Sequence, residues 1–337
     1  MSSVPLIIFG LGRVGRTFLR QLVSNRQALA QRLNLDLVVV GLAALEHMVF
    51  DPAGLTDERL LALVKALESG DSLLDFEGGQ VKASNQELLA RLFDALDEVP
   101  IIIDTTNAQE MASDLIYALD QGCCMALTNG RALVGPWSTS RRFFESPHVR
   151  FEATVGYICS QLQLGVPFSA ALAQAQDLGY TEHDPREDLN GQDSARKILI
   201  MGRLAGWPLE MRDVQVERLC SPNLASLPPG LFMERVSQLD DNMAQRVQVA
   251  REEGCVLRYV AEIDAGGARV GLRAVPRVSQ LGVLQGSECL VTIFTARYTV
   301  SPLTISGRGV GPELGAAALL RDVVSLAGSR FRMSPIE

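Results

Sequence analysis

The segment from Gly179 to Lys197, GYTEHDPREDLNGQDSARK, carries eight charged side chains in a chain that is otherwise mostly apolar. Its carboxylates can hold a substrate ammonium group through charge-assisted hydrogen bonds. A lysine can accept a hydroxyl proton as a hydride leaves the same carbon, or return that proton to a carbonyl. Glu182, Asp193 and Lys197 therefore form a candidate set for oxidising an amino alcohol.

The end of this segment is expected to start a helix, while the turn-rich EHDPREDLNG before it must be organised by other parts of the chain. Asn190 is the expected N-cap, with Asp193 three residues on in a capping-box-like position. A helix from Gly191 places Asp193 and Lys197 on one face. The alternative is a solvated helix start with a local ion pair. The buried side of this helix is predicted to carry Ala195, Ile198 and Leu199.

A second candidate site follows the first predicted strand. GLGRVG, residues 10–15, comes directly after the apolar run VPLIIFG and opens a helical pattern. Glycines at this spacing allow a tight turn, an approach of backbone to pyrophosphate and close helix–strand packing, and the helix N-terminus attracts phosphate. The alternative is a glycine turn without a ligand. The residues expected to hold a dinucleotide are Gly10, Leu11, Gly12, Arg13, Val14 and Gly15.

The choice of dinucleotide depends on the end of the second predicted strand. That strand reads VVVGLAALE, and Glu46 comes too late to hold a ribose 2′-hydroxyl. Arg13 could instead meet a 2′-phosphate, which favours NADP over NAD, or it could be an exposed residue at the helix start. Thr105 and Thr106 end a later strand, so they are expected beside the nicotinamide ribose. The alternative is that a threonine or Asn107 caps the next helix.

The order of apolar segments indicates how these sites are positioned. Strand and helix patterns alternate up to residue 155, which predicts an α/β class with a Rossmann-type, doubly wound parallel sheet. The later pattern is less regular and predicts a second, smaller α+β domain. The predicted parts are a dinucleotide-binding domain at 1–156, the smaller domain at 157–306 and a C-terminal segment at 307–337 that returns to the first domain.

Composition limits the classes of partner. The chain has 337 residues, 47% of them hydrophobic, which is enough for two domains. A net charge of −8 without a Lys/Arg-rich run argues against nucleic acid or an anionic membrane surface. Three histidines and six scattered cysteines form no zinc pattern, so no metal is expected. There is no signal-like start and no apolar run of about 20 residues, which predicts a soluble cytoplasmic protein.

These motifs together resemble those of the homoserine dehydrogenases. The charged segment, GLGRVG, FEATVG (151–156), SQLDDNMAQRVQVAREEGCVLRYVAEID (237–264) and GRGVG (307–311) are similar to the family's, over nearly the whole chain. The likeness points to the dehydrogenase portion of bifunctional aspartokinase–homoserine dehydrogenases. It implies reversible, NAD(P)-dependent interconversion of L-homoserine and L-aspartate 4-semialdehyde in amino-acid biosynthesis. It also implies a homodimer formed through the second domain, which would bind the substrate.

The resemblance assigns roles to individual residues. Lys197 would be the catalytic lysine of its helix. Gly309 and Gly311 would approach the nicotinamide end of the cofactor. The substrate-binding residues would be Tyr180, Glu182, Asp188 and Asp193.

The chain departs from the family pattern at three places. Arg131 stands where the family has a second lysine, and an arginine can orient an oxygen or a carboxylate but cannot exchange protons near neutrality. Most of a segment between FEATVG and Tyr157 is missing, and Gly315 replaces a threonine. Three hypotheses follow: a dehydrogenase acting on homoserine or a related small amino acid, a dinucleotide-binding homologue without turnover, and an enzyme whose Arg131 recognises an added acidic group.

Overall fold

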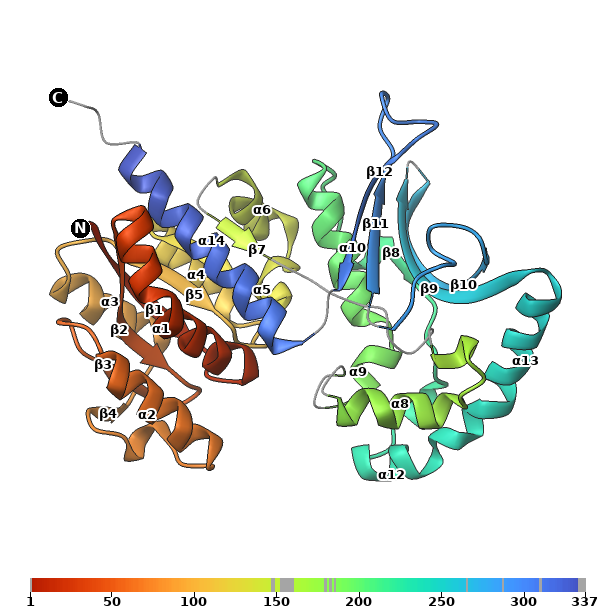
Figure 1. Cartoon of the computed structure of the whole chain (residues 1–337), viewed down its shortest axis with the longest axis horizontal. Helices are drawn as coiled ribbons and strands as arrows, with labels where there is room; N and C mark the ends of the chain where they lie inside the picture. The colour runs from red at the N-terminus through yellow and green to blue at the C-terminus, as the bar shows by residue number, and fades with distance from the viewer. Residues whose placement is uncertain are drawn as a thin grey trace. The chain divides into compact units, whose positions relative to one another are not determined.

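The computed structural model describes residues 2–146, 149–151, 161–178, 181, 184, 186–264, 266–286, 288–308 and 311–332. The chain divides into two compact units (Figure 1). One consists of Met1–Glu152 with Pro312–Glu337, and the other of Ala153–Gly311. The functional division predicted from the sequence, with limits at residues 156 and 306, stays a prediction.

The first unit is built on a seven-stranded sheet with the order β4-β3-β2-β1-β5-β6-β7. The chain leaves β1 for β2 on one side and later returns to β5 on the other side of β1. The carboxyl ends of β1 and β5 therefore form the switch point at which open α/β sheets bind ligands. The predicted Rossmann-type α/β class is confirmed. The parallel strands are β2 (Leu35–Ala43), β1 (Ser2–Phe9), β5 (Ile101–Asp104), β6 (Cys124–Leu127) and β7 (Val149–Phe151).

One edge of this sheet is antiparallel, which the sequence analysis did not predict. β3 (His47–Phe50) runs antiparallel to β2, and β4 (Gly79–Val81) runs antiparallel to β3. Only three residues separate β2 from β3, and the Ala44 N–H donates to the His47 carbonyl at 2.8 Å. Such a short connection permits a hairpin but not the crossover that a parallel strand needs.

Helices cover both faces of the sheet. α1 (Arg13–Leu33), α2 (Asp57–Glu68) and α14 (Pro312–Arg332) share one core with Leu6 and Ile8 of β1. Ile7 points to the opposite face, where it lies with Leu92 of α3 beside Gly41. The α14 helix is tied to α1 because Gln21 donates to the Glu313 carbonyl at 3.0 Å. The other helices of this unit are α3 (Asn85–Ala95), α4 (Met111–Asp120), α5 (Gly130–Leu133) and α6 (Trp137–Glu145).

The second unit contains a three-stranded sheet with the order β8-β10-β9. β9 (Cys255–Asp264) is antiparallel to β10 (Gly267–Pro276), and β8 (Val214–Val216) is parallel to β10. The α10 helix (Gln192–Leu204) lies against all three strands. The remaining helices are α8 (Phe168–Asp177), α9 (Arg186–Leu189), α11 (Pro222–Ala225), α12 (Pro229–Arg235) and α13 (Asp240–Glu252).

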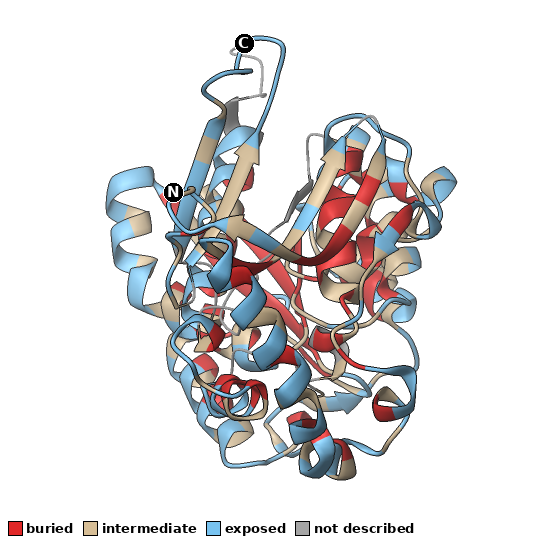
Figure 2. Cartoon of the chain, turned by 90° about the vertical axis from the view of Figure 1, so that its right-hand side faces the viewer, coloured by how far each residue is buried: buried red, intermediate tan, exposed pale blue. Residues whose placement is uncertain are grey.

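A separate hairpin of β11 (Glu288–Ile293) and β12 (Leu303–Arg308) completes the second unit. Its described residues are half-buried or exposed, as Figure 2 shows for the paired strands. The buried core of the unit lies elsewhere, among residues that include Phe168, Phe232 and Met243. In the portions of the chain that the structure describes, no helix has the length and apolar character needed to cross a membrane.

Candidate active site

The glycine turn joins β1 to α1 at the switch point, and two of its glycines are required by packing alone. Gly10 has a φ of +90°, and a Cβ there would lie 2.7 Å from the Thr105 carbonyl carbon. A Cβ on Gly15 would lie 2.2 Å from the Gly10 carbonyl oxygen. Only glycine fits these close approaches, whether or not a ligand binds. These two positions therefore do not distinguish a dinucleotide site from a simple glycine turn.

Gly12 differs from both, because packing does not require a glycine at this position. It has no positive φ, and a Cβ at this position would meet nothing within 4 Å. Gly12 is the N-cap of the 21-residue helix α1, which has no side-chain cap and no acidic residue in its first turn. The first N–H groups and the positive end of the helix dipole are thus available to an anion. An open glycine at an uncapped helix start fits a pyrophosphate group.

The other residues of the turn divide between the interior and the surface. Leu11 is buried in the core of the first unit, so it supports the turn from below. Val14 is half-buried, and a Cβ on Gly315 of α14 would lie 3.9 Å from both of its methyl groups. Arg13 is exposed at the first position of α1. Of these three side chains, the arginine is the one that an incoming ligand could readily meet.

Thr105 ties the end of β5 to the glycine turn. Its hydroxyl donates to the Gly10 carbonyl at 2.6 Å, and its N–H donates to the Phe9 carbonyl at 2.8 Å. The Thr106 hydroxyl accepts from the Ala108 N–H at 3.3 Å. The following helix, α4, has Glu110 as its N-cap and no side-chain cap. The alternative that a threonine or Asn107 caps this helix is therefore wrong.

A buried polar cluster below this turn was missed by the sequence analysis. Asp104 is fully buried and accepts from the Thr106 N–H at 2.8 Å. Asn129 donates to Asp104 at 3.0 Å, to the Thr106 hydroxyl at 3.1 Å and to the Ala108 carbonyl at 2.7 Å. Burial raises the pKa of Asp104, and these hydrogen bonds oppose the rise. The sequence did contain a signal for this cluster. Asp104 comes directly after three isoleucines, and the end of such an apolar strand is expected to be buried.

The same asparagine fixes the backbone that carries Arg131. Its side-chain oxygen accepts from the Arg131 N–H at 3.0 Å and so caps α5. Arg131 is half-buried in the first unit. Arg131 thus belongs to the first unit, whereas Lys197 belongs to the second.

The charged pair predicted on α10 is present. Lys197 Nζ lies 2.6 Å from Asp193 Oδ2, and Arg196 lies 3.5 Å from the other carboxylate oxygen. Only 19% of the Lys197 side chain and 25% of the Asp193 side chain are exposed. Both side chains are half-buried, so a catalytic pair and a local ion pair at a helix start both stay possible interpretations. Ala195, Ile198 and Leu199 are buried as predicted.

The helix start differs from the prediction by one residue. Gly191, with a φ of +72°, is the N-cap of α10 and provides no side-chain cap. The Asn190 side chain instead accepts from the Gln192 N–H at 2.8 Å and closes the turn before the helix. The predicted asparagine cap was therefore wrong, because the backbone reverses at the glycine.

Arg186 organises the turn-rich segment before α10. Its Nε donates to Asp184 Oδ1 at 2.8 Å, and its Nη1 donates to the carbonyls of Ala225, at 3.2 Å, and Leu227. The four-residue helix α9 begins at this arginine, where the sequence indicated only turns. One guanidinium therefore fastens the segment to the loop that follows α11.

Several predicted site residues are not placed by the structure. Tyr180, Glu182 and Gly309 lie outside the described residues. Asp188 lies in α9, but its side chain is outside the described part. Gly311 has a φ of +111° just before α14. Among the residues that are described, no group of three or more His, Cys, Asp or Glu is arranged to hold a metal ion.

Comparison with known proteins decides the family. The profile described as homoserine dehydrogenase matches residues 149–324, more than half of the chain. The chain belongs to the homoserine dehydrogenase family. It is thus related to NAD(P)-dependent dehydrogenases.

Two relatives show how much of the homoserine dehydrogenase sequence is shared. The bifunctional aspartokinase/homoserine dehydrogenase 2 of Escherichia coli (strain K12) is 28% identical over 367 residues, covering 97% of this chain and 43% of the relative. The homoserine dehydrogenase of Paracoccidioides brasiliensis (strain Pb18) is 38% identical over 163 residues, covering 47% of this chain and 44% of the relative. The chain thus spans less than half the length of these relatives. The first alignment is longer than the chain itself, so that relative has residues that this chain lacks.

Solved structures agree with the fold. A Candida auris protein of unknown function has a TM-score of 0.79 at 27% identity, with 97% of this chain and 99% of that chain covered. A hyperthermophilic archaeal homoserine dehydrogenase in complex with NADPH has a TM-score of 0.71 at 18% identity, with both chains fully covered. The second likeness supports the fold alone.

Substitution by alanine should affect mainly stability at Gly15 and mainly dinucleotide binding at Gly12. Gly15→Ala should lower the free energy of unfolding by about 1–3 kcal/mol through overpacking against the Gly10 carbonyl. Gly12→Ala should lower the free energy of unfolding by about 0.5–1 kcal/mol, because alanine is a poorer N-cap than glycine, although its methyl group meets no neighbour. It should weaken NADP+ binding, since its methyl group would occupy the open space above the turn. Urea denaturation and titration calorimetry measure the two effects. Unchanged binding by the Gly12 variant would contradict the assignment of the pyrophosphate site.

The raised pKa of Asp104 predicts a pH dependence of stability. The folded state holds the Asp104 proton more tightly than the unfolded state, so the free energy of unfolding falls as pH rises from the ordinary value of 3.8 through the raised one. Asp104→Asn should remove this fall, and losing the Asn129 hydrogen bond should cost about 1–3 kcal/mol. Urea denaturation at a series of pH values measures both.

The exposed Asp71 supplies the control for this measurement. Asp71→Asn should reproduce the pH profile of the natural chain. An unchanged profile in the Asp104 variant would mean that this buried carboxyl does not titrate as its surroundings imply.

Proposed function

We propose that the protein is an NAD(P)-dependent dehydrogenase that interconverts L-homoserine and L-aspartate 4-semialdehyde, or a closely related amino-acid alcohol and aldehyde. The observation that carries this proposal is the half-buried ion pair of Lys197 and Asp193. It lies in a chain of the homoserine dehydrogenase family, at the segment whose residue types suit a substrate with an ammonium group and a hydroxyl group.

NADP is the proposed cofactor, held at the open glycine turn of the first unit. β2 ends at Ala43, and the next residues, Ala44 and Leu45, offer no acid to a ribose 2′-hydroxyl. Leu45 is 83% exposed, and the Glu46 carbonyl is engaged by the Lys82 N–H at 2.9 Å. The exposed Arg13 can meet a 2′-phosphate. A homoserine dehydrogenase of this fold was solved with NADPH, which supports the same class of cofactor here.

Lys197 is the proposed proton carrier. The bound nicotinamide supplies or accepts a hydride at its C4 position. In the oxidative direction, the neutral amine of Lys197 would accept the hydroxyl proton of homoserine while the carbinol carbon loses a hydride and a C=O bond forms, and the resulting ammonium would pair with Asp193. In the reductive direction, Lys197 returns a proton to the carbonyl oxygen. An ammonium has three donors, so the bond to Asp193 leaves others that can meet a substrate oxygen.

The remaining polar residues would bind and orient the substrate. Asp193 keeps the lysine directed through the 2.6 Å contact, and the carboxylates of Glu182 and Asp188 would hold the substrate ammonium with Tyr180 beside them. Arg131 would bind a carboxylate or polarise an oxygen, because its guanidinium stays protonated. We further propose a cytoplasmic homodimer that acts on small molecules and needs no metal.

Lys197→Ala should lower kcat for homoserine oxidation by about 10²–10⁴-fold, because a general acid/base group is lost. Reduction of NADP+ and NAD+ followed by absorbance measures this, with small semialdehydes and oxo acids tested in the reverse direction. Lys65→Ala is the matched control, since Lys65 is an exposed lysine near the end of α2.

Three outcomes separate the hypotheses. Turnover that survives in the Lys197 variant would reject the proposed mechanism. Dinucleotide binding without turnover of any substrate would identify a homologue that has lost activity, as Arg131 and the missing segment would allow. Turnover confined to a substrate with an added acidic group would indicate a changed specificity.

A further inference from the structure

The turn that starts α10 lies directly under one tyrosine hydroxyl. A Cβ on Gly191 would lie 2.2 Å from the Tyr259 hydroxyl oxygen and 2.6 Å from a methyl group of Val216. The backbone of residue 191 is therefore pressed against both neighbours. A displacement of this turn toward the sheet is blocked by the hydroxyl group, which comes from β9, far along the chain.

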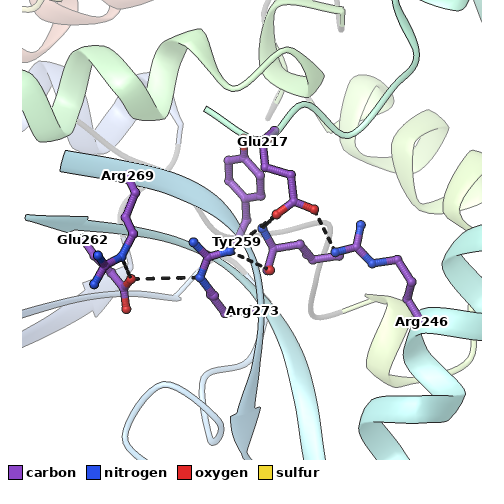
Figure 3. A network of polar contacts seen from close by, with 7 residues as sticks. Glu217, Arg246, Tyr259, Glu262, Arg269 and Arg273 are labelled. Atoms are coloured by element: carbon purple, nitrogen blue, oxygen red, sulfur yellow. Dashed lines mark hydrogen bonds and ion pairs between the residues drawn. The ribbon is translucent and has the colours of Figure 1, made fainter. Parts of the chain in front are cut away.

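The hydroxyl itself is held in a fixed place. It donates to the Glu217 carbonyl at 2.7 Å, and the Glu217 N–H donates to the Val270 carbonyl of β10 at 2.8 Å. The Glu217 carboxylate accepts from Arg246 of α13 at 2.9 Å and from the Leu272 N–H at 3.1 Å (Figure 3). The acceptor of the tyrosine is thus anchored to a strand and to a helix.

The backbone at Gly191 also fixes the position of the first two helical turns of α10. The Gly191 carbonyl accepts the first helical hydrogen bond, from the Ala195 N–H at 2.9 Å. Asp193 and Lys197 project from these two turns. The Leu219 N–H donates to the Leu189 carbonyl at 2.9 Å, so the residues before the turn are fastened to the same segment as Glu217. The direction of the ion pair therefore depends on contacts with the sheet.

We propose that Tyr259 is a positioning residue, whose hydroxyl holds the Gly191 turn and with it Asp193 and Lys197 in the arrangement that proton transfer requires. The inference rests on the proposed function. In this scheme Tyr259 acts on the reaction through the Gly191 turn. Misplacing a catalytic group by about 1 Å can reduce a rate by about 100-fold, so a single hydroxyl can matter at this distance from the chemistry.

Tyr259→Phe tests this role, because it keeps the ring and removes only the hydroxyl group. The kcat for homoserine oxidation should fall by about ten-fold or more, with the KM for NADP+ unchanged. Tyr298→Phe is the matched control, since Tyr298 is 51% exposed between β11 and β12. Glu262→Gln is the control within the network of Figure 3, because the partners of Glu262 among the described residues are Arg269 and Arg273 of β10. Both controls should retain the natural kcat.

A second readout reports on Lys197 without turnover. The chain has only three lysines, Lys65, Lys82 and Lys197, so reductive methylation with ¹³C-formaldehyde gives few NMR signals. In Tyr259→Phe, the Lys197 methyl resonance should move toward its position in Asp193→Asn, the reference for a lost ion pair. The resonances of Lys65 and Lys82, which lie in the first unit, should stay in place.

The outcomes are distinguishable. If Tyr259→Phe lowers the melting temperature but leaves both kcat and the Lys197 resonance unchanged, the tyrosine only packs and the inference is overturned. If the natural protein has no turnover, the proposed function fails, and the Lys197 resonance alone decides whether the hydroxyl positions the pair. If Tyr259→Phe does not fold, Gly191→Ala displaces the turn from the opposite side. It should shift the same resonance, and an unmoved signal would reject the role.

Discussion

The ion pair between Lys197 and Asp193 is the interaction on which the proposed chemistry of the second unit depends. An ion pair that is partly removed from water is stabilising only when the surrounding chain holds both charges in a favourable geometry. The helix provides the spacing of four residues, and the αL conformation of Gly191 provides the sharp start of the helix. The start of α10 thereby fixes where Asp193 and Lys197 leave the backbone, as a proton-transfer group would require.

In the first unit, too, hydrogen bonds from distant residues hold the backbone of the candidate site in place. Thr105 closes the glycine turn from β5, and Asn129 holds the ends of β5 and β6 together below it. The turn is thus rigid before any ligand arrives, so little conformational entropy would be lost on binding. The glycines of the motif also serve different purposes. Gly10 and Gly15 make the turn possible, whereas Gly12 keeps the space above it open.

Local patterns were sufficient to predict the parallel strands, the main helices and the spacing of Asp193 and Lys197. They failed where a distant residue decides the outcome. Asp104 and Asn129 are 25 residues apart, and their contact exists only because β5 and β6 are neighbours. The N-cap of α10 is Gly191 and not Asn190, in a turn that lies against Tyr259. The antiparallel edge was missed because β3 has only four residues and follows β2 after a three-residue turn, so its sequence pattern is too short to indicate a strand.

A crystal structure of the protein with NADP+ and homoserine bound tests the central claim most directly. The homoserine hydroxyl oxygen should lie about 3 Å from Lys197 Nζ, within hydrogen-bond reach. The carbon that bears this hydroxyl should face C4 of the nicotinamide, and the pyrophosphate should cover Gly12. A structure in which Lys197 is directed away from the substrate, or in which the pyrophosphate binds elsewhere, would contradict it.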